Sequence, residues 1–467
     1  MISDNLLTAA ANSYSFDKST LQFISDSTNQ MYEFYKDGKR FILRFSQRPL
    51  EEIHQTKAEM DWLYYLAENK INVSLPLLSD NGELVITAED DNKTYIISAY
   101  EALSGMFFDK NNPARWNGKV FYNWGKLTGD LHRLTKDYTP KNDVDVRTEF
   151  NGRYALDDNI KKCAPINKIA EDLIAEIMAL PKDKDSYGLI HYDLHPWNFL
   201  IDGDKINVFD FDDCLYGWFV SDIGVALYHA LWWGRKNDAG YDFTDEIIDN
   251  FLDGYLSANY LSDFWISKIP LFMKYRQICK FSWFYNPDSD DAHQKERMYN
   301  IENDIFFTDR FEYREIGKLR FIGIDAWRTG EDWDDLWARS DEFMPALDVL
   351  MSEYAADITD NCAMMHHNGN EVDTENHYLA GRFFKADTPV PDGFDYYDVP
   401  TNRAAYAIYT AAKYDGDIGS AYYTTRDRIL NDGVGIPYPQ AYWHAAVYTN
   451  SRPRDGIARF GYMFSIQ

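Results

Sequence analysis

Short runs of alternating apolar and polar positions dominate the first hundred residues and predict a small antiparallel sheet. After a helical opening, residues 21–45 contain two or three such runs, and the Asp37-Gly38 pair between them is typical of a hairpin turn. Residues 49–69 then space their apolar side chains as an amphipathic helix does. Two further strands follow. We therefore expect residues 1–103 to form a β-rich lobe carrying one long helix.

From Pro113 the apolar side chains recur every three or four positions, which indicates helices. Helices are predicted near 113–132 and 166–180, and again from 222 almost to 309. Two short apolar strands lie between them. We expect residues 104–309 to form a helical lobe, joined to the β-rich lobe by a hinge near 101–105, with a cleft between the two lobes.

Beyond residue 310 one order of elements occurs twice: strand, helix, strand, strand. Strands are predicted at 319–324, 363–367, 377–384, 403–410, 441–448 and 457–466, and helices at 333–354 and 421–430. The repeat concerns the order of elements and not the residues themselves. It predicts an α+β domain of two similar halves over residues 311–467, with a concave surface where the halves meet.

Composition narrows the range of partners. Lys and Arg total 47 against 75 Asp and Glu, a formal net charge of −28, which disfavours binding to nucleic acid or to an anionic membrane. The four cysteines are widely spaced without a CxxC pair, so neither a disulfide framework nor a structural zinc site is indicated. No signal segment or membrane-spanning run is evident. We expect a cytoplasmic protein whose ligands are small molecules.

The most informative stretch is LIHYDLHPWNFLIDGDKINVFDFDD at 189–213. Asp193 follows a short strand, Asn198 comes five residues later, and Asp210 ends the next strand. A phosphoryl-transfer site that uses magnesium and a nucleotide needs such a set. We expect Asp193 to accept the proton of an acceptor hydroxyl, and Asn198 and Asp210 to hold Mg²⁺. An isolated Asp of this kind is more often a turn or helix cap, but the spacing favours the site.

Neighbouring polar residues each allow two interpretations. His191 is interpreted as a hydrogen-bonding residue of the loop. The alternative is a zinc site formed by His191 and His195 with Asp193, which would leave Asn198 and the following strand unexplained. Asp212 and Asp213 either bind metal or a cationic acceptor, or are solvated turn residues. Asp222 either caps the N-terminus of a helix starting at residue 223 or braces the catalytic loop.

The β-rich lobe is expected to hold the nucleotide. A polar turn between its first two strands could offer amides and hydroxyls to phosphate oxygens, although it contains no glycine. A strand arginine could reach the phosphates while a helix glutamate fixes it by an ion pair; a surface salt bridge is the alternative. The adenine is expected to lie along the last strand before the hinge. The residues concerned are Ser27, Thr28, Asn29, Arg44, Glu59, Ser98 and Tyr100.

The motif HYDLHPWN at 191–198, followed by INVFDFD at 206–212, resembles the catalytic signature of the aminoglycoside phosphotransferase and choline kinase-like family. These relatives of the protein kinases phosphorylate small molecules. LTGDLH at 127–132 and KAEM at 57–60 resemble two helices of the same family. The resemblance covers roughly residues 10–309.

This resemblance implies a kinase-like fold that uses ATP or GTP with magnesium. It also implies that Asp193 is the catalytic base and that Asn198 and Asp210 are the metal ligands. Two features depart from the family pattern: Arg44 stands where a lysine is common, and the phosphate turn lacks glycine. Arginine keeps the charge of lysine but not its geometry.

Residues 311–467 resemble the effector-binding domain shared by gyrase-inhibitor-like proteins and AraC-type, multidrug-responsive regulators. The resemblance rests on YLAG at 378–381, VPDGF at 390–394 and Val399-Pro400. It implies a cleft for small cationic or aromatic molecules. Aromatic residues that could line the cleft, or pack in a core instead, are Trp333, Trp337, Tyr406, Tyr442, Trp443 and Tyr448.

Two details of residues 311–467 limit the kinds of ligand that we expect this domain to bind. The effector-binding family often places a glutamate where this chain has Ala445 and Ala446. His366 and His367 are interpreted as part of a polar turn rather than as a metal pair. No helix-turn-helix segment or basic stripe is evident, so control of transcription is not expected.

The sequence thus predicts an α+β protein, a two-lobed kinase-like fold followed by a tandem βαββ domain. Our hypothesis is a phosphotransferase that transfers a phosphoryl group from ATP or GTP, with Mg²⁺, to a hydroxyl of a small molecule. It would be fused to a domain that binds a second small ligand. A non-catalytic sensor of a nucleotide or drug is the alternative from another class, and an antibiotic-resistance phosphotransferase is a further enzyme alternative.

Overall fold

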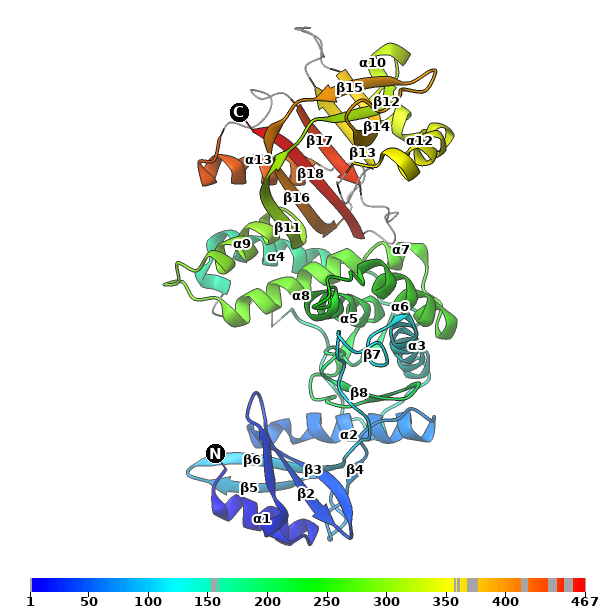
Figure 1. The fold of residues 1–467 in the computed structure, drawn as a ribbon. Coiled ribbons are helices and arrows are strands. Elements are labelled where there is room, and N and C mark those ends of the chain that lie inside the picture. The colour runs from blue at the N-terminus through cyan, green and yellow to red at the C-terminus, as the bar shows by residue number, and fades with distance from the viewer. Residues whose placement is uncertain are drawn as a thin grey trace. The chain divides into compact units, whose positions relative to one another are not determined.

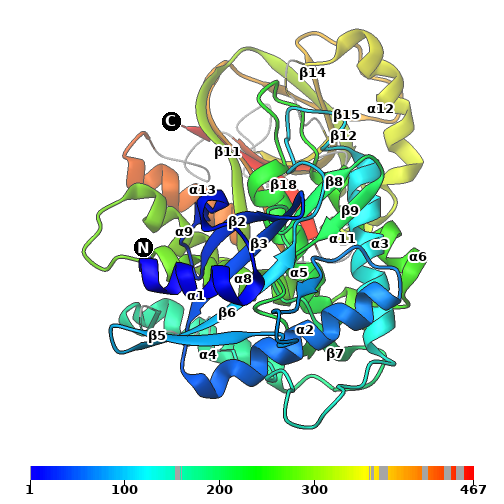
Figure 2. The ribbon, with the colours of Figure 1, turned by 90° about the horizontal axis from the view of Figure 1, so that it is seen from below.

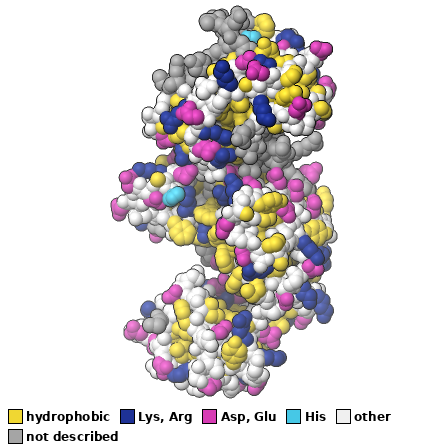
Figure 3. Space-filling view, viewed as in Figure 1, with side chains coloured by type: hydrophobic (Ala, Val, Ile, Leu, Met, Phe, Trp, Pro, Cys, Tyr) yellow, Lys and Arg dark blue, Asp and Glu magenta, His cyan; other side chains and the backbone are white. Residues whose placement is uncertain are grey.

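The computed structural model describes residues 2–152, 158, 160–356, 358, 362–367, 377–412, 419–435, 443–448 and 457–466. The chain divides into two compact units, which are described separately. Unit 1 comprises Met1–Asp157 and Ala170–Arg276, and unit 2 comprises Asp158–Ile169 and Gln277–Gln467 (Figure 1). None of the described helices is both long enough and apolar enough to cross a membrane. On the face shown in Figure 3, acidic side chains are interspersed with Lys and Arg.

The β-rich part of unit 1 is one antiparallel sheet. Its strand order is β1 (Gln22–Ser25), β2 (Gln30–Lys36), β3 (Lys39–Gln47), β6 (Lys93–Glu101) and β4 (Pro76–Leu77), with β5 (Ile86–Asp90) also paired to β6. The predicted hairpin is confirmed: Lys36 pairs with Lys39, and Asp37 and Gly38 between them have φ of 50° and 74°. Such left-handed pairs match the twist of two-residue hairpins.

Two helices cover opposite faces of this sheet, α1 (Asp4–Tyr14) and α2 (Ile53–Glu68) (Figures 1 and 2). Side chains alternate along β3, so its two faces meet different partners. Phe41, Leu43 and Phe45 pack in a core with residues of α1. Arg44 lies on the other face, where α2 supplies its partner. Because of this alternation, the positive charge of Arg44 is buried between the sheet and α2.

The remainder of unit 1 is mainly helical. It contains α3 (Gly118–Thr135), α5 (Phe219–Gly234), α6 (Thr244–Ala258) and α7 (Asp263–Ile266), together with parts of α4 (Ala164–Met178) and α8 (Ile269–Phe284). Helices α3 and α6 approach closely because each has a glycine at the contact. A Cβ added at Gly125 would lie 1.8 Å from the carbonyl oxygen of Phe251, and one at Gly254 would lie 1.9 Å from that of Tyr122. No larger residue fits at either position.

Two short antiparallel strand pairs, which we call the two ladders, carry the predicted catalytic stretch. Strand β7 (Tyr187–Ile190) pairs with β10 (Leu215–Trp218), and β8 (Phe199–Asp202) pairs with β9 (Lys205–Val208). The loop from 191 to 198 therefore runs from one ladder to the other. Residues 209–214 make the return connection.

Unit 2 contains η3 (Ile160–Lys162), α9 (Ala292–Glu302) and an eight-stranded antiparallel sheet. The strand order is β11 (Ile305–Ile316), β16 (Asn402–Ala412), β18 (Ile457–Ile466), β17 (Trp443–Tyr448), β13 (Cys362–His367), β14 (His377–Lys385), β12 (Leu319–Asp325) and β15 (Asp395–Val399). Reading outward from the central β17–β13 pair, the order in each half is second, third and first strand. The two halves thus share one topology.

The helices of unit 2 that follow the first strand of each half pack on the same face of this sheet. They are α10 (Ala326–Thr329), α11 (Trp333–Ala338), α12 (Ser340–Tyr354) and α13 (Gly419–Asp432). Leu336 and Phe343 meet Met364 of β13, and Ile429 meets Ala446 of β17. Met364 and Ala446 are directly paired across the sheet, so their side chains point to one face.

Several expectations for this region are wrong. The sequence pattern does not predict the edge strands β11 and β15, and β11 begins at Ile305, inside the stretch expected to be helical. The helix expected over 333–354 is two helices, separated at Arg339. His366 and His367 do not lie in a polar turn: they lie in β13 with 8% and 4% of their surface exposed. Their rings stack on tyrosines, which explains how a central strand holds them.

Candidate active site

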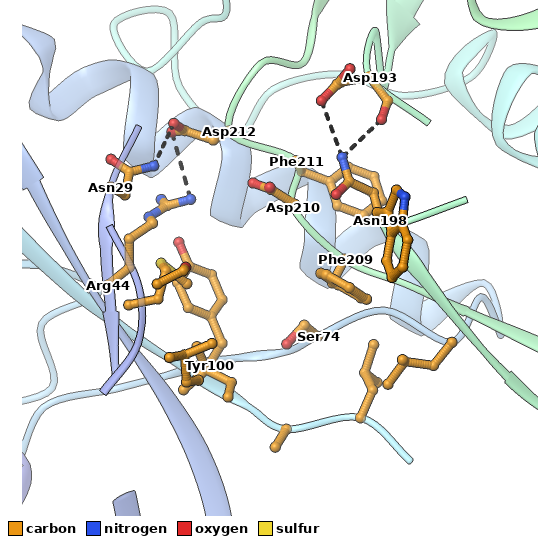
Figure 4. A pocket seen from close by; sticks show the side chains of 18 of the residues that line it. Asn29, Arg44, Ser74, Tyr100, Asp193, Asn198, Phe209, Asp210, Phe211 and Asp212 are labelled. Atoms are coloured by element: carbon orange, nitrogen blue, oxygen red, sulfur yellow. Dashed lines mark hydrogen bonds and ion pairs between the residues drawn. The ribbon is translucent and has the colours of Figure 1, made fainter. Parts of the chain in front are cut away.

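A cavity of about 730 Å³ lies within unit 1 between the sheet and the two short ladders (Figure 4). Most residues singled out from the sequence line it. They are Ser27, Thr28, Asn29, Arg44, Glu59, Tyr100, Asp193, Asn198, Asp210, Asp212 and Asp213. Ser98 is not among the lining residues, because it is fully buried opposite Arg44 in the β3–β6 pair. The chain beyond the strand, from Ala102 to Met106, contributes to the wall instead.

The catalytic loop is held by a buried carboxylate from α5. Asp222 accepts hydrogen bonds from the backbone N–H groups of His191 and Tyr192, at 2.9 and 2.6 Å, and lies 3.2 Å from Nε2 of His132. The helix begins at Phe219 with Trp218 at its cap, so the N-cap interpretation of Asp222 is wrong. Tyr192 has a φ of 69°, a strained value for a residue with a side chain. Asp222 fixes this strained loop.

His191 links the loop to the second ladder. Its Nε2 donates to the carbonyl oxygen of Phe209 at 3.1 Å, and its Nδ1 accepts from the N–H of Asp193 at 3.3 Å. Burial lowers the pKa of His191, in keeping with a neutral ring. Both ring nitrogens of His191 are thus engaged within the protein, as expected of a hydrogen-bonding residue of the loop.

Both carboxylate oxygens of Asp193 have partners. Oδ2 lies 3.2 Å from Nδ2 of Asn198 and 3.4 Å from Nε2 of His195, and Oδ1 contacts Nη2 of Arg276 (Figure 4 shows the Asn198 contact). Burial by itself would raise the pKa of Asp193, but Arg276 and His195 hold it well below its usual range. Asp193 is therefore an anion. Sequence reasoning did not identify Arg276.

Asp210 differs from Asp193 in forming no ion pair with a described residue, although the charge of Arg44 lowers its pKa in part. Its oxygens open to the cavity (Figure 4), and its φ of 63° is left-handed. Surrounding protein, followed by the negative charges of Asp212 and Asp193, raises the pKa of Asp210 to about 7. A divalent cation at this point would relieve that repulsion. Asn198 also lines the cavity, and Mg²⁺ is usually held by one or two carboxylates together with substrate phosphates. These residues therefore fit a divalent metal.

On the sheet side, four charged residues form what we call the arginine cluster: Arg44, Arg48, Glu59 and Asp212. Arg44 binds Glu59 through two hydrogen bonds of 3.0 and 2.7 Å and lies 3.6 Å from Asp212. Arg48 also contacts Asp212. The Arg44–Glu59 pair is almost completely buried, so it is not the surface salt bridge of the alternative interpretation.

Asp212 ties this cluster to the polar turn before β2. Asn29 donates to its Oδ2 at 3.0 Å (Figure 4). Burial raises the pKa of Asp212, but Arg44 and Arg48 outweigh burial and hold the pKa below its usual range. With 7% of its surface exposed, Asp212 is not a solvated turn residue. Asp213 is partly buried and lines the cavity. Arg48 is a further residue missed from the sequence.

The aromatic candidates of unit 2 are only partly described. Tyr406 and Trp443 are fully buried and belong to one hydrophobic core. Arg310 and Arg314 lie over the ring of Tyr406, at 5.0 and 4.2 Å. Tyr442 lies outside the described residues, and so do the side chains of Trp333, Trp337 and Tyr448.

Residues 20–263 match the model of the Phosphotransferase enzyme family, APH, which is more than half of the chain. The chain belongs to this family. Amicoumacin kinase of Bacillus subtilis (strain 168) is 34% identical over 312 residues, which are 65% of this chain and 91% of that protein. This similarity confirms the expected kinase family, and the chain is a small-molecule kinase. The alternative of a non-catalytic sensor is therefore set aside.

Two solved structures resemble the same part of the chain. An amicoumacin kinase in complex with AMP-PNP, Ca²⁺ and Ami has a TM-score of 0.59 and 29% identity, covering 65% of this chain and 94% of that one. A microcompartment-associated aminopropanol kinase has a TM-score of 0.52 and 20% identity, covering 65% and 96%. The second likeness concerns the fold alone. Both cover about two thirds of this chain.

Proposed function

We propose that the chain transfers the γ-phosphoryl group of ATP or GTP to a hydroxyl of a small molecule, with Mg²⁺ as the metal. The observation that carries this proposal is the meeting of Asp193, Asn198 and Asp210 in one cavity with the Arg44–Glu59 pair. The solved amicoumacin kinase, bound to AMP-PNP and Ca²⁺, supports a nucleotide and a divalent cation.

Each residue has a separate task in this proposal. The Asp193 carboxylate orients the acceptor hydroxyl and takes its proton as the new O–P bond forms and the bond to the leaving nucleoside diphosphate breaks. Its low pKa suits a loose transition state, in which the proton moves late. Asn198 and Asp210 hold the metal, which supplies positive charge against the phosphates. Arg44, fixed by Glu59, faces the phosphates from the sheet side.

The first acceptor to test is amicoumacin. The support is the 34% identity to the Bacillus subtilis kinase, of which this chain covers 91%. An amino alcohol is the second choice, on the weaker ground of a shared fold with the aminopropanol kinase. An antibiotic acceptor would place the chain among resistance phosphotransferases, the enzyme alternative noted above.

The test is ADP or GDP release by Asp193→Ala and Asp210→Ala, with amicoumacin and Mg²⁺. Loss of a positioned general base costs about 10²- to 10⁴-fold, so both variants should fall far below the wild type. Asp204→Ala is the matched control, because Asp204 is exposed and pairs with Lys119 at the surface. Undiminished transfer by either active-site variant would overturn these assignments.

For residues 311–467 we propose a second small-molecule site in an effector-binding-like domain, following lobes at 1–103 and 104–309. The shared topology of the two sheet halves supports it. So does Trp443, whose buried Nε1 has no hydrogen-bond partner among the described residues. Titration of the full chain with tetraphenylphosphonium, followed by calorimetry, tests the site. Saturable binding that Trp443→Phe weakens supports the proposal, and an absence of binding overturns it.

A further inference from the structure

Arg276 of α8 is a buried cation that the phosphoryl-transfer scheme above does not use. It has 3% of its surface exposed. Nη2 contacts Oδ1 of Asp193, and Nε donates to Nε2 of His229 at 2.7 Å. Asp193 stands in the catalytic loop, His229 in α5 and Arg276 in α8. Three segments that are distant in the sequence therefore meet at one guanidinium.

The charge of this guanidinium cannot be removed by titration, because arginine stays protonated in proteins. A buried cation needs an anion, and Asp193 provides one. His229 accepts a hydrogen bond from Nε of Arg276 on its Nε2, and this contact orients the guanidinium. The ring of His229 is fully buried and stacks on Trp233 at 4.6 Å. Two packed helices thus fix the direction from which the guanidinium meets the carboxylate.

This arrangement assigns different tasks to the two oxygens of Asp193. Oδ1 is engaged by Arg276, while Oδ2 faces Asn198 and His195. When a guanidinium that is itself fixed binds one oxygen of an Asp carboxylate, the carboxylate cannot rotate freely about the Cβ–Cγ bond. The other oxygen is left in a defined place to receive a proton. Catalytic groups need such placement to within about 0.5 Å.

We propose that Arg276 is a positioning residue for phosphoryl transfer, which orients the Asp193 carboxylate through an ion pair braced by His229. The proposal rests on the proposed function of Asp193. Arg276 itself touches neither nucleotide nor acceptor in this scheme. Its removal should therefore lower kcat and leave nucleotide binding unchanged.

Arg276→Ala with ATP, Mg²⁺ and amicoumacin is the first experiment. We expect kcat to fall about 100-fold, the loss typical of a catalytic group displaced by about 1 Å, while the KM for ATP stays within about twofold. Arg276→Lys should recover part of the loss, since it restores the charge without the fork. Arg133→Ala is the control, because Arg133 pairs with Asp130 at the surface of α3. An unchanged kcat in Arg276→Ala would overturn the proposal.

Chemical rescue separates positioning from general structural damage. Guanidinium ion at millimolar concentration should raise the kcat of Arg276→Ala several-fold, because it can enter the space left by the side chain. Urea has a similar planar shape but no charge, so it should not rescue. Rescue by both compounds, or by neither, would contradict an ion-pair role.

A double-mutant cycle tests the ion pair without any assay of activity. Unfolding of wild type, Arg276→Ala, Asp193→Asn and the double variant is followed by denaturant. The two single losses should sum to more than the loss in the double variant, because each single variant leaves a buried charge alone. Additive losses would overturn the ion pair. Full activity of Asp193→Ala would instead overturn the proposed function, so the two failures are distinguishable.

Discussion

The arginine cluster and the Asp210 carboxylate lie in the same cavity and differ in how their charges are balanced. The cluster holds two cations and two anions in direct contact, and Asp212 within it keeps a pKa below its usual range. For Asp210, two residues earlier, the surrounding protein and the negative charges of Asp212 and Asp193 outweigh Arg44 and raise the pKa to about 7. Neighbouring positions in one strand connection thus have opposite electrostatic surroundings. The charges of the cluster are balanced within it, whereas Asp210 forms no ion pair with a described residue.

The largest effect is expected from removing the charge of Asp210. Asp210→Asn keeps the size of the side chain but cannot attract a divalent cation equally well. We expect kcat to fall about 10³-fold, similar to the loss of one preorganised electrostatic contact. Steady-state rates across a Mg²⁺ titration provide the measurement, with Asp204→Asn as the surface control. A variant that keeps wild-type rates at low Mg²⁺ would show that Asp210 does not hold the metal.

Breaking the arginine cluster should instead reduce stability. Glu59→Gln removes the negative charge that is bound directly to the buried Arg44 and leaves Asp212, 3.6 Å away, as its nearest anion, so we expect a loss of about 3 kcal/mol in the free energy of unfolding. Urea denaturation measures it. Glu176→Gln is the control, since Glu176 pairs with Lys268 at the surface. If the two variants were equally stable, Glu59 would not be neutralising the buried charge of Arg44, and the prediction would be wrong.

A smaller effect is expected when the charge of Arg44 is kept and only its paired hydrogen bonds to Glu59 are changed. Arg44→Lys keeps the positive charge against Glu59 but loses one of the two hydrogen bonds. We expect the KM for ATP to rise about tenfold, equivalent to about 1.4 kcal/mol, with a smaller change in kcat. Arg133→Lys serves as the control in the same assay. A lower KM in Arg44→Lys would show that lysine is the better phosphate partner in this chain.

The smallest effect concerns pH. The ionised form of Asp210 binds a cation and the protonated form does not, so Mg²⁺ affinity should fall as pH falls through about 7. Between pH 7.5 and 6.5 the ionised fraction drops about threefold, and the apparent Kd for Mg²⁺ should rise by a similar factor. Calorimetric titration of the nucleotide-free protein measures it. In Asp210→Asn this pH dependence should disappear.

Local patterns predicted the elements of unit 1 well. The Asp37-Gly38 hairpin and the amphipathic period of α2 depend on residues close in sequence, and both are present. Edge strands such as β11 and β15 were missed because they pair on one side only, which leaves a weaker alternation of apolar and polar positions. The histidines of β13 were misplaced because burial among stacked rings has no local signal.

The same limit applies to the site. Spacing alone pointed to Asp193, Asn198 and Asp210, and the cavity brings them together. Arg48 and Arg276 act through contacts with residues 164 and 83 positions away, which no local pattern can show. Weak signals did exist. Arg48 follows the last residue of β3 at an even spacing from Arg44, and Arg276 is a cation within a largely apolar, aromatic helix, where a partner is needed.

The left-handed backbone at Asp210 restricts which residues can occupy this position at all. At a φ of 63°, Gly, Asn and Asp are tolerated, whereas a β-branched side chain would collide with its own backbone. Of the three, only Asp also carries a negative charge. Backbone shape and chemistry therefore select the same amino acid for independent reasons. Random mutagenesis at this codon should accordingly yield folded but inactive protein with Asn or Gly, and poorly folded protein with Val or Ile.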